Sequence, residues 1–174
     1  MTFMGYKRPD GLVGIRNHVL ILPTCACASE TCRVVSQQVA GSIHIINNSG
    51  CAEVKANEDM TQTILRGFAA NPNIFGTVVI GLGCENVGHR ELREAIEKIT
   101  NKPIVSFGIQ EEGGTPNTIR LAVRAAREMV AAASIQKREP CGMSNLILGL
   151  ECGGSDATSG FAANPALGYV SDKL

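Results

Sequence analysis

Four cysteines are the residues of this sequence best suited to metal chemistry. Each comes shortly after a different short apolar run, and such runs are typical of strands buried on both faces of a parallel sheet. Soft thiolates gathered at one place suit iron, zinc or an iron–sulfur cluster. The alternative is four small residues buried in tight turns, because free cysteine is among the most buried residue types. The candidate metal ligands are Cys27, Cys51, Cys84 and Cys152.

The three remaining cysteines, Cys25, Cys32 and Cys141, are expected to fill space in the core. The seven cysteines form no C-x-x-C pair, so a metal site has to be assembled by the fold rather than by local spacing. The first eight residues lack the apolar core of a signal peptide, and no apolar run reaches the length of about 18 residues that a membrane helix needs. We therefore expect a cytoplasmic protein with free thiols or metal ligands rather than disulfides.

Two carboxylates are candidates for proton transfer, and both stand beside glycine-rich turns. Glu85 follows Gly81-Leu82-Gly83-Cys84, and Asp156 ends the run Glu151-Cys152-Gly153-Gly154-Ser155-Asp156. The first turn begins like a dinucleotide-binding fingerprint, but Asn86 occupies the place of the third glycine. A plain surface turn explains it equally well. His89 is expected to begin a helix and is a further candidate base.

Several residues could bind the carboxylate of a substrate. Arg16, followed by Asn17, could hold a carboxylate in two parallel hydrogen bonds, although pairing with Asp10 is the commoner fate of such an arginine. Gly113, Gly114 and Thr115 stand at a predicted helix start, where backbone N–H groups and the helix dipole favour an anion, although an ordinary helix cap uses the same residues. Ser155 lies in the second glycine-rich loop and is a further candidate for substrate binding.

The elements that position these residues alternate in type. Apolar runs rich in β-branched residues are separated by amphipathic runs of helical length, which is the pattern of parallel βαβ units. The predicted strands are residues 18–23, 42–47, 76–82, 103–108 and 145–150. The predicted helices are residues 29–39, 58–70, 89–100 and 115–133. This order predicts an α/β fold with a doubly wound, mostly parallel five-stranded sheet, helices on both faces (Rossmann-like) and a ligand site at the carboxyl ends of the strands.

Length and charge fit one soluble domain that handles small molecules. The chain has 174 residues, and its 16 basic residues balance 16 acidic ones. No stretch combines clustered Lys or Arg with aromatic residues, so neither a nucleic-acid surface nor a membrane surface is expected. Residues 1–174 are interpreted as a single α/β domain, and residues 164–174 read like the approach to a further helix. We expect the chain to be the N-terminal part of a larger catalytic module.

Taken together, the motifs resemble the altronate and galactarate dehydratase family, which includes the large subunit of sulfolactate sulfo-lyase. The resemblance extends over essentially the whole chain. The matching stretches are GYKRPDGLVGIRN at residues 5–17, CA at 27–28, GC at 50–51, Gly67 with NPN at 71–73, GLGCE at 81–85, GGT at 113–115, KREP at 137–140, CGGSD at 152–156 and ANPALG at 163–168.

The resemblance implies a metal-dependent lyase, usually linked to iron, that removes water from a sugar acid to give a 2-keto-3-deoxy acid. The alternatives are release of sulfite from sulfolactate and a non-catalytic module that binds a nucleotide or another ligand. The implied cofactor is iron, as Fe²⁺ or an iron–sulfur cluster, with Mn²⁺ as an alternative. The resemblance also implies a separate small companion subunit, leaves a homo-oligomer open, and predicts that this chain folds but does not catalyse by itself.

One position departs from the family pattern. Asn47 stands where the sugar-acid enzymes have a histidine, four residues before the cysteine of the Gly50-Cys51 pair. If that histidine is a base or a ligand in the relatives, the catalytic base of this chain has to be a different residue.

Overall fold

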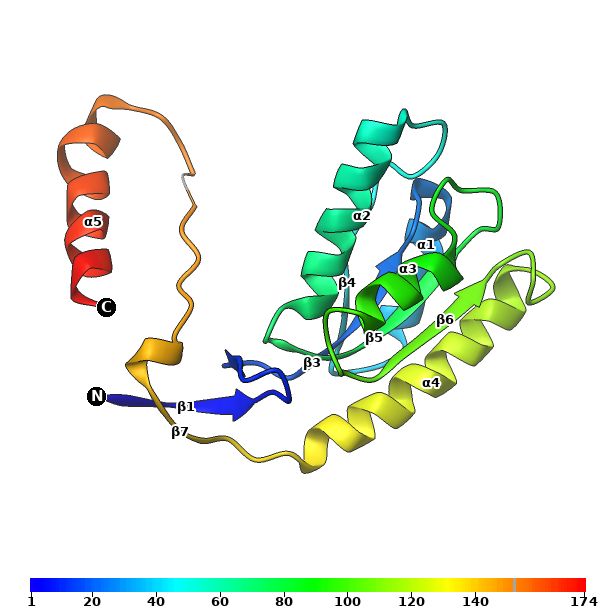
Figure 1. Cartoon of the computed structure of the whole chain (residues 1–174), viewed down its shortest axis with the longest axis horizontal. Coiled ribbons are helices and arrows are strands. Elements are labelled where there is room, and N and C mark those ends of the chain that lie inside the picture. Colours follow the sequence, from blue (N-terminus) through cyan, green and yellow to red (C-terminus); the bar gives the residue numbers. More distant parts are fainter. Residues whose placement is uncertain (152) are drawn as a thin grey trace. The chain divides into compact units, whose positions relative to one another are not determined.

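The computed structural model describes residues 1–151 and 153–174, which cluster into two compact units. The larger one, here called the sheet unit, is Gly5–Glu139, and the smaller one, the C-terminal unit, combines Met1–Met4 with Pro140–Leu174. Each unit is described by itself below. Figure 1 shows the succession of elements along the chain.

The sheet unit is built around four parallel strands within residues 5–139. They are β3 (His18–Pro23), β4 (Ser42–His44), β5 (Ile74–Gly81) and β6 (Ile104–Gly108), in the spatial order β4-β3-β5-β6. The register places Ile21 opposite both His44 of β4 and Val78 of β5. The sequence predicted β3 with its observed bounds, while β4 is shorter than the predicted strand and β5 begins two residues earlier.

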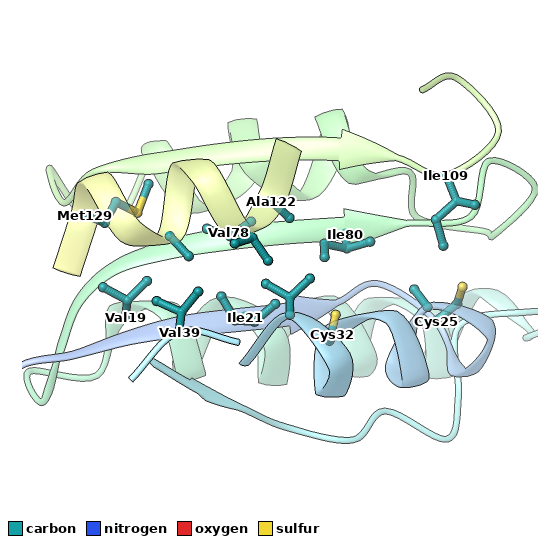
Figure 2. Packing of buried hydrophobic residues seen from close by; sticks show 14 residues of the cluster. Val19, Ile21, Cys25, Cys32, Val39, Val78, Ile80, Ile109, Ala122 and Met129 are labelled. Atoms are coloured by element: carbon teal, nitrogen blue, oxygen red, sulfur yellow. The ribbon is translucent and has the colours of Figure 1, made fainter. Parts of the chain in front are cut away.

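One face of this sheet is covered by α1 (Ala26–Gln37) and α4 (Thr115–Ile135). Alternate strand residues such as Val19, Ile21 and Val78 point to this face, as expected from the two-residue period of a strand. They pack against Cys32 of α1 and small or flexible residues of α4, including Ala122 and Met129 (Figure 2). Small residues on α4 allow the helix backbone to approach the sheet closely.

The opposite face is covered by α2 (Lys55–Ala70) and α3 (His89–Glu97). Leu20 and Leu22 of β3 point to this side and share a core with Leu65 of α2 and Leu92 of α3. Helices therefore flank the sheet on both faces, and each of the four predicted helices is found. All four start or end two or three residues away from the predicted bounds because terminal turns lack a strong sequence signal.

A smaller sheet has the strand order β2-β1-β7, with β1 at Thr2–Lys7, β2 at Val13–Gly14 and β7 at Glu139–Gly142. The β1–β2 pair is antiparallel, with Tyr6 opposite Gly14. Over the described part of the chain, no helix combines the length and the apolar character needed to cross a bilayer.

The predicted fifth strand at residues 145–150 is not formed. Residues Met143–Asn145 make a 3-10 turn, and residues 146–150 have no regular structure. The segment has the apolar composition of a buried strand, but Ile147, Leu148 and Leu150 are exposed. A strand needs a hydrogen-bonded neighbour to be stable, and composition cannot show whether a sheet edge is in reach. The C-terminal unit then continues with a π-helical turn (Ser159–Ala163) and α5 (Asn164–Lys173).

Candidate functional site

The carboxyl ends of β3 and β5 form the point of the sheet unit where the chain changes direction. From β3 the chain passes through α1 to β4 on one side, and then returns to β5 on the other side. In open α/β sheets, ligands bind in the crevice at such a switch point. The loops that leave β3 and β5 here carry Cys25, Cys27, Cys84 and Glu85.

Three sulfur atoms gather at this edge. The Sγ atoms of Cys25, Cys27 and Cys51 all lie within 4.8 Å of one another. Cys25 is buried, whereas Cys27 and Cys51 are exposed to solvent. The prediction that Cys27 and Cys51 face one site agrees with this geometry. Cys25 was expected to fill space in the core, and it does lie in the core cluster, but its sulfur atom also completes the trio. We refer to these three residues as the thiol cluster.

The first two thiols belong to the start of α1. Cys25 is the N-cap residue of the helix, and Cys27 is its second residue. The first N–H groups of a helix have no partner inside the helix, and the helix dipole favours negative charge at this end. A C-x-C pair at such a position thus presents two sulfur atoms where anionic ligands are favoured. This position, rather than the spacing alone, is the signal that could have identified Cys25 as part of the site.

Gly50 allows the loop that carries Cys51 to approach the start of α1. Its φ angle is +103°, and a Cβ atom there would lie 2.5 Å from the Thr24 carbonyl oxygen and 2.8 Å from the Cys25 Cα atom. Neither the backbone angle nor the space is available to another residue. The Gly50-Cys51 pair is therefore explained by the close approach of two loops.

Asn47 also holds the loop that carries Cys51, through hydrogen bonds of its side chain. Its side-chain amide donates to the Thr24 carbonyl oxygen at 3.0 Å, and its Oδ1 accepts from the Ser49 N–H at 3.0 Å. The Ala26 N–H also donates to the Ser49 carbonyl oxygen at 2.9 Å. Asn47 thus holds the Cys51 loop against the Cys25 loop.

Cys84 lies on the neighbouring loop and interacts electrostatically with the thiol cluster. Desolvation raises the pKa of the Cys51 thiol to about 11, and the nearby thiols of Cys25, Cys27 and Cys84 act in the same direction. The Asn86 N–H donates to the Gly50 carbonyl oxygen at 3.0 Å, which ties the Cys84 loop to the Cys51 loop. The fourth predicted ligand, Cys152, lies outside the described residues.

Glu85 is held rigidly beside the cluster. Its two carboxylate oxygens accept hydrogen bonds from the Thr24 hydroxyl at 2.9 Å and from the Gly83 N–H at 2.5 Å. Partial burial would raise the pKa of Glu85, but these hydrogen bonds outweigh it and hold the pKa below its usual value. Glu85 is therefore ionised at neutral pH and can accept a proton rather than deliver one.

Asp156 and Ser155 lie in the C-terminal unit and are exposed. The Thr158 hydroxyl donates to Asp156 Oδ1 at 2.5 Å, and the Ser159 N–H donates to the same oxygen at 2.9 Å. These hydrogen bonds, the Thr158 hydroxyl first, lower the pKa of Asp156. Asp156 thus caps a helical turn of its own unit, and its role as acid or base stays a prediction.

Arg16 and Asn17 lie at the opposite end of the sheet from the thiol cluster. They precede β3, whereas Cys25 follows it. The Asn17 amide donates to the Ala133 carbonyl oxygen at 2.8 Å, and the exposed Arg16 guanidinium contacts the neighbouring Ile15 carbonyl oxygen at 3.3 Å. The structure therefore does not bring these two residues together with the cysteines, and their binding of a substrate carboxylate stays a prediction.

The Gly113-Gly114-Thr115 turn follows β6 and so belongs to the same edge as the cysteines. Gly114 is the N-cap of α4, where Thr115 was expected to be. The Gly113 N–H donates to the Gln110 carbonyl oxygen at 3.3 Å, and the Gly114 N–H donates to the Ile109 carbonyl oxygen at 2.8 Å. Two of the N–H groups expected to bind an anion are thus used within the turn itself.

The thiol cluster has a donor set that fits a soft or borderline metal ion. Metal–sulfur bonds are near 2.3 Å, so two thiolates on one ion are at most about 4.6 Å apart, and small side-chain rotations bring the three sulfur atoms within that limit. Three thiolates leave a fourth position, which Cys84 or a ligand oxygen can take. Thiolate donors favour iron or zinc, whereas Mn²⁺ prefers oxygen donors.

Comparison with known families gives two matches that together account for most of the chain. The family model of the D-galactarate dehydratase/altronate hydrolase second domain matches residues 5–134, and the model of the D-galactarate/altronate dehydratase C-terminal region matches residues 143–174. The break between the two matches falls close to the boundary between the two compact units. No solved structure matches the chain.

Three similar proteins cover nearly the whole chain. The (2R)-sulfolactate sulfo-lyase subunit beta of Chromohalobacter salexigens is 39% identical over 173 residues, which are 99% of this chain and 43% of the relative. The altronate dehydratase of Bacillus subtilis is 33% identical, with 99% of this chain and 36% of the relative covered. The galactarate dehydratase (L-threo-forming) of Escherichia coli is 31% identical, with 99% and 37% covered. The chain thus spans about two fifths of the length of these relatives.

Proposed function

We propose, from the premise that the chain belongs to the D-galactarate dehydratase/altronate hydrolase family, that it contributes the metal-binding part of a lyase that dehydrates a sugar acid to a 2-keto-3-deoxy acid. The observation that carries the proposal is the thiol cluster at the switch point of the sheet. Its family relatives are named as dehydratases and as a sulfo-lyase subunit, all of which are lyases.

The proposed ligands are Cys25, Cys27 and Cys51, with Cys84 in the fourth position and iron as the metal. When bound, such a metal would supply Lewis-acid stabilisation of the negative charge that develops beside the substrate carboxylate. Glu85 accepts a hydrogen bond from Thr24, the residue before Cys25, and would accept the proton that leaves the carbon next to the carboxylate. Thr24 and Gly83 hold its carboxylate in place for that step.

Sulfite release from sulfolactate is the second candidate, and the 39% identity to the sulfo-lyase subunit favours it about equally. Both reactions begin with loss of a proton next to a carboxylate and differ in the group that leaves. Hydroxide is a poor leaving group and needs a proton, whereas sulfite is a weaker base and leaves without one. The word "subunit" in the relative's name also supports a companion chain in the proposed assembly.

Nucleotide binding by the Gly81–Glu85 turn is less well supported. The Gly83 N–H, which a phosphate group would need, already donates to the Glu85 carboxylate at 2.5 Å. A negative carboxylate therefore occupies the place where a phosphate would bind.

Metal analysis of protein purified without oxygen tests the proposal. We expect close to one equivalent of iron per chain, and at least a tenfold lower affinity in the Cys27→Ser and Cys51→Ser variants. Cys32→Ala is the matched control, because Cys32 is buried in the core and is not part of the cluster. Equal metal contents in the wild type and in a Cys27→Ser/Cys51→Ser double variant would show that the cluster holds no metal.

Product analysis separates the two reactions. The chain, combined with its companion subunit, is offered altronate, galactarate or (2R)-sulfolactate in turn. Formation of a 2-keto-3-deoxy acid identifies a dehydratase, and release of sulfite identifies a sulfo-lyase. Tight nucleotide binding without either product would contradict both.

A further inference from the structure

The turn that carries Cys51 has a strained backbone. It lies in residues 45–54, which follow β4 and contain no helix or strand. Cys51 stands between two residues in the left-handed region, Gly50 with a φ angle of +103° and Ala52 with a φ angle of +54°. A side chain makes this region unfavourable, and such strain persists only where the surrounding structure imposes it, most often at functional sites. The fold therefore accepts strain in order to hold Cys51 against the start of α1.

The sulfur atoms of the thiol cluster are close enough to be joined in pairs. The Sγ atoms of Cys27 and Cys51 lie within 4.8 Å of each other, and the two atoms of a disulfide lie about 2.05 Å apart. The two atoms thus have to approach by at most about 2.8 Å. A change between staggered rotamers moves a cysteine sulfur by about 3 Å. Side-chain rotation alone therefore covers the distance.

The cysteines of this edge differ in their access to solvent. Cys27 and Cys51 are exposed, whereas Cys25 is 0% exposed and packs in the core. Cys84 is also exposed, but it does not belong to the trio of adjacent sulfur atoms. A dissolved oxidant therefore reaches two thiols that also lie side by side, and these are Cys27 and Cys51.

We propose that Cys27 and Cys51 are an oxidative modification site, at which a hydroperoxide converts the two thiols into a reversible disulfide. The bond would tie the start of α1 to the loop that follows β4. The proposal does not rest on the proposed function, because it requires only the positions and the exposure of the two thiols.

The reaction has two steps. In the first, the O–O bond of the peroxide breaks, one sulfur takes up an oxygen atom to become a sulfenic acid, and water leaves when hydrogen peroxide is the oxidant. In the second, the other thiol attacks that sulfur, the S–O bond breaks, and the hydroxyl group leaves with the proton of the attacking thiol as a second water molecule. The two thiols lose two electrons in total, and the peroxide gains them. A dithiol such as dithiothreitol reverses the reaction by exchange.

The disulfide would also compete with a metal ion for the same sulfur atoms. Thiolates bind metal ions, whereas the sulfur atoms of a disulfide carry no negative charge. Oxidation thus removes two of the three sulfur donors of the thiol cluster, and a metal ion bound by these donors protects them from oxidation.

Mass spectrometry of the unmodified chain tests the proposal. The reduced chain, freed of metal by a chelator, is treated with a small excess of hydrogen peroxide and then alkylated. We expect the intact mass to fall by two hydrogen atoms and two of the seven cysteines to escape alkylation. Peptide mapping should join the peptide that contains Cys27 to the peptide that contains Cys51, and dithiothreitol should restore both thiols.

Three single variants provide the second arm. Cys27 and Cys51 are exposed, so serine at either position is compatible with folding. In Cys27→Ser and in Cys51→Ser, we expect disulfide formation to slow by about tenfold or more, because the remaining partner in the trio is the buried Cys25. Cys84→Ser is the matched control, since Cys84 is an exposed cysteine outside the trio, and it should oxidise at the wild-type rate.

Zn²⁺, which does not change its oxidation state, separates this proposal from the metal site. Zn²⁺ added before the peroxide should slow disulfide formation by about tenfold or more, and Mg²⁺, which prefers oxygen donors, should not. A disulfide that forms equally fast with and without Zn²⁺ would contradict the metal site and support the modification site.

Three results would overturn the proposal. They are oxidation of single cysteines to sulfinic acid without any disulfide, a disulfide that maps to Cys25 or Cys84 instead of the pair Cys27 and Cys51, and equal rates of disulfide formation in Cys27→Ser and Cys84→Ser.

Discussion

The two ends of the parallel sheet differ in how their charged and reactive side chains are engaged. At the amino ends of the strands, the buried Arg8 guanidinium donates to the Pro72 carbonyl oxygen, to Asn17 and to the Arg16 carbonyl oxygen at 2.7–2.9 Å. At the carboxyl ends, three thiols crowd together and His89 Nδ1 has no partner among the described residues. The first end stabilises the fold, and the second end carries the proposed ligand site.

Lys102 is a second buried cation that is paired with carbonyl oxygens at the amino end. Its ammonium group donates to the carbonyl oxygens of Ala69, Ala70 and Asn71 at 2.6–3.2 Å. These are the last carbonyls of α2, which lack partners inside the helix and attract a positive charge. Substitutions at this end should therefore change stability, and those at the other end should change binding.

Arg8→Met should have the largest effect on stability. The variant removes the donor from the Pro72 and Arg16 carbonyl oxygens and from Asn17, so we expect a loss of about 4 kcal/mol in the free energy of unfolding. Urea titration followed by circular dichroism measures it. Arg16→Met is the matched control, because Arg16 is exposed and should stay within about 0.5 kcal/mol of the wild type. Equal losses in the two variants would show that the hydrogen bonds of Arg8 do not stabilise this end of the sheet.

Gly50→Ala should affect both stability and binding, because Gly50 lies at the binding end. The strained φ angle and the clash with Thr24 and Cys25 predict a loss of about 3 kcal/mol. The displaced Cys51 loop should also lower metal affinity at least tenfold. Gly67→Ala is the control, because Gly67 lies within α2 with open space around it and should gain about 0.5–1 kcal/mol. Unchanged metal affinity in Gly50→Ala would contradict the role of this contact.

Lys102→Met should have the smallest effect of the three, a loss of about 2 kcal/mol at neutral pH. The Ala69 and Ala70 carbonyl oxygens lose this donor, whereas the Asn71 carbonyl oxygen still accepts from the Ile74 N–H. Calorimetric or urea unfolding measures the loss. A variant as stable as the wild type would show that water replaces the ammonium group without cost.

The pH dependence of Lys102 sharpens this prediction. Burial lowers the pKa of Lys102 to about 8 in the folded chain, whereas an unfolded lysine titrates near 10.4. Between these values the unfolded state binds more protons, so this group makes the free energy of unfolding rise with pH. This increase in the free energy of unfolding is lost again as the pH falls to about 8. Relative to Lys102→Met, the wild type should therefore gain stability between pH 8 and 10.5. If the free energies of unfolding of the two proteins changed with pH in parallel, that result would contradict the burial of the charge.

Much of the sheet unit could be predicted from the sequence because its signals are local. The run HVLILP gave β3 with its observed bounds, and glycine with proline marked the start of α4. The segment at residues 145–150 has the same apolar character, but it is exposed and forms no strand. Whether an apolar segment forms a strand depends on whether the backbone groups of another strand are within hydrogen-bonding distance. That is determined by the fold and not by the segment itself.

The site was harder to predict, because its residues are selected by contacts that are remote in sequence. Cys25 and Cys32 have the same side chain, but only Cys25 lies next to Cys51. It does so because Gly50 allows the loop that carries Cys51 to approach the start of α1. Arg8 and Arg16 both stand beside turn glycines. Arg8 is buried and Arg16 is exposed, a difference that the sequence around them does not indicate.

The order of the thiol cluster along the chain has a consequence for synthesis. All three of its cysteines lie within the first 51 residues, whereas α4, which covers that face of the sheet, ends at Ile135. A ribosome adds about 5–20 residues per second. For several seconds the newborn chain therefore carries its sulfur atoms without the helix that shares a core with Cys25, and this interval is when oxidants and competing metal ions have the freest access to that thiol.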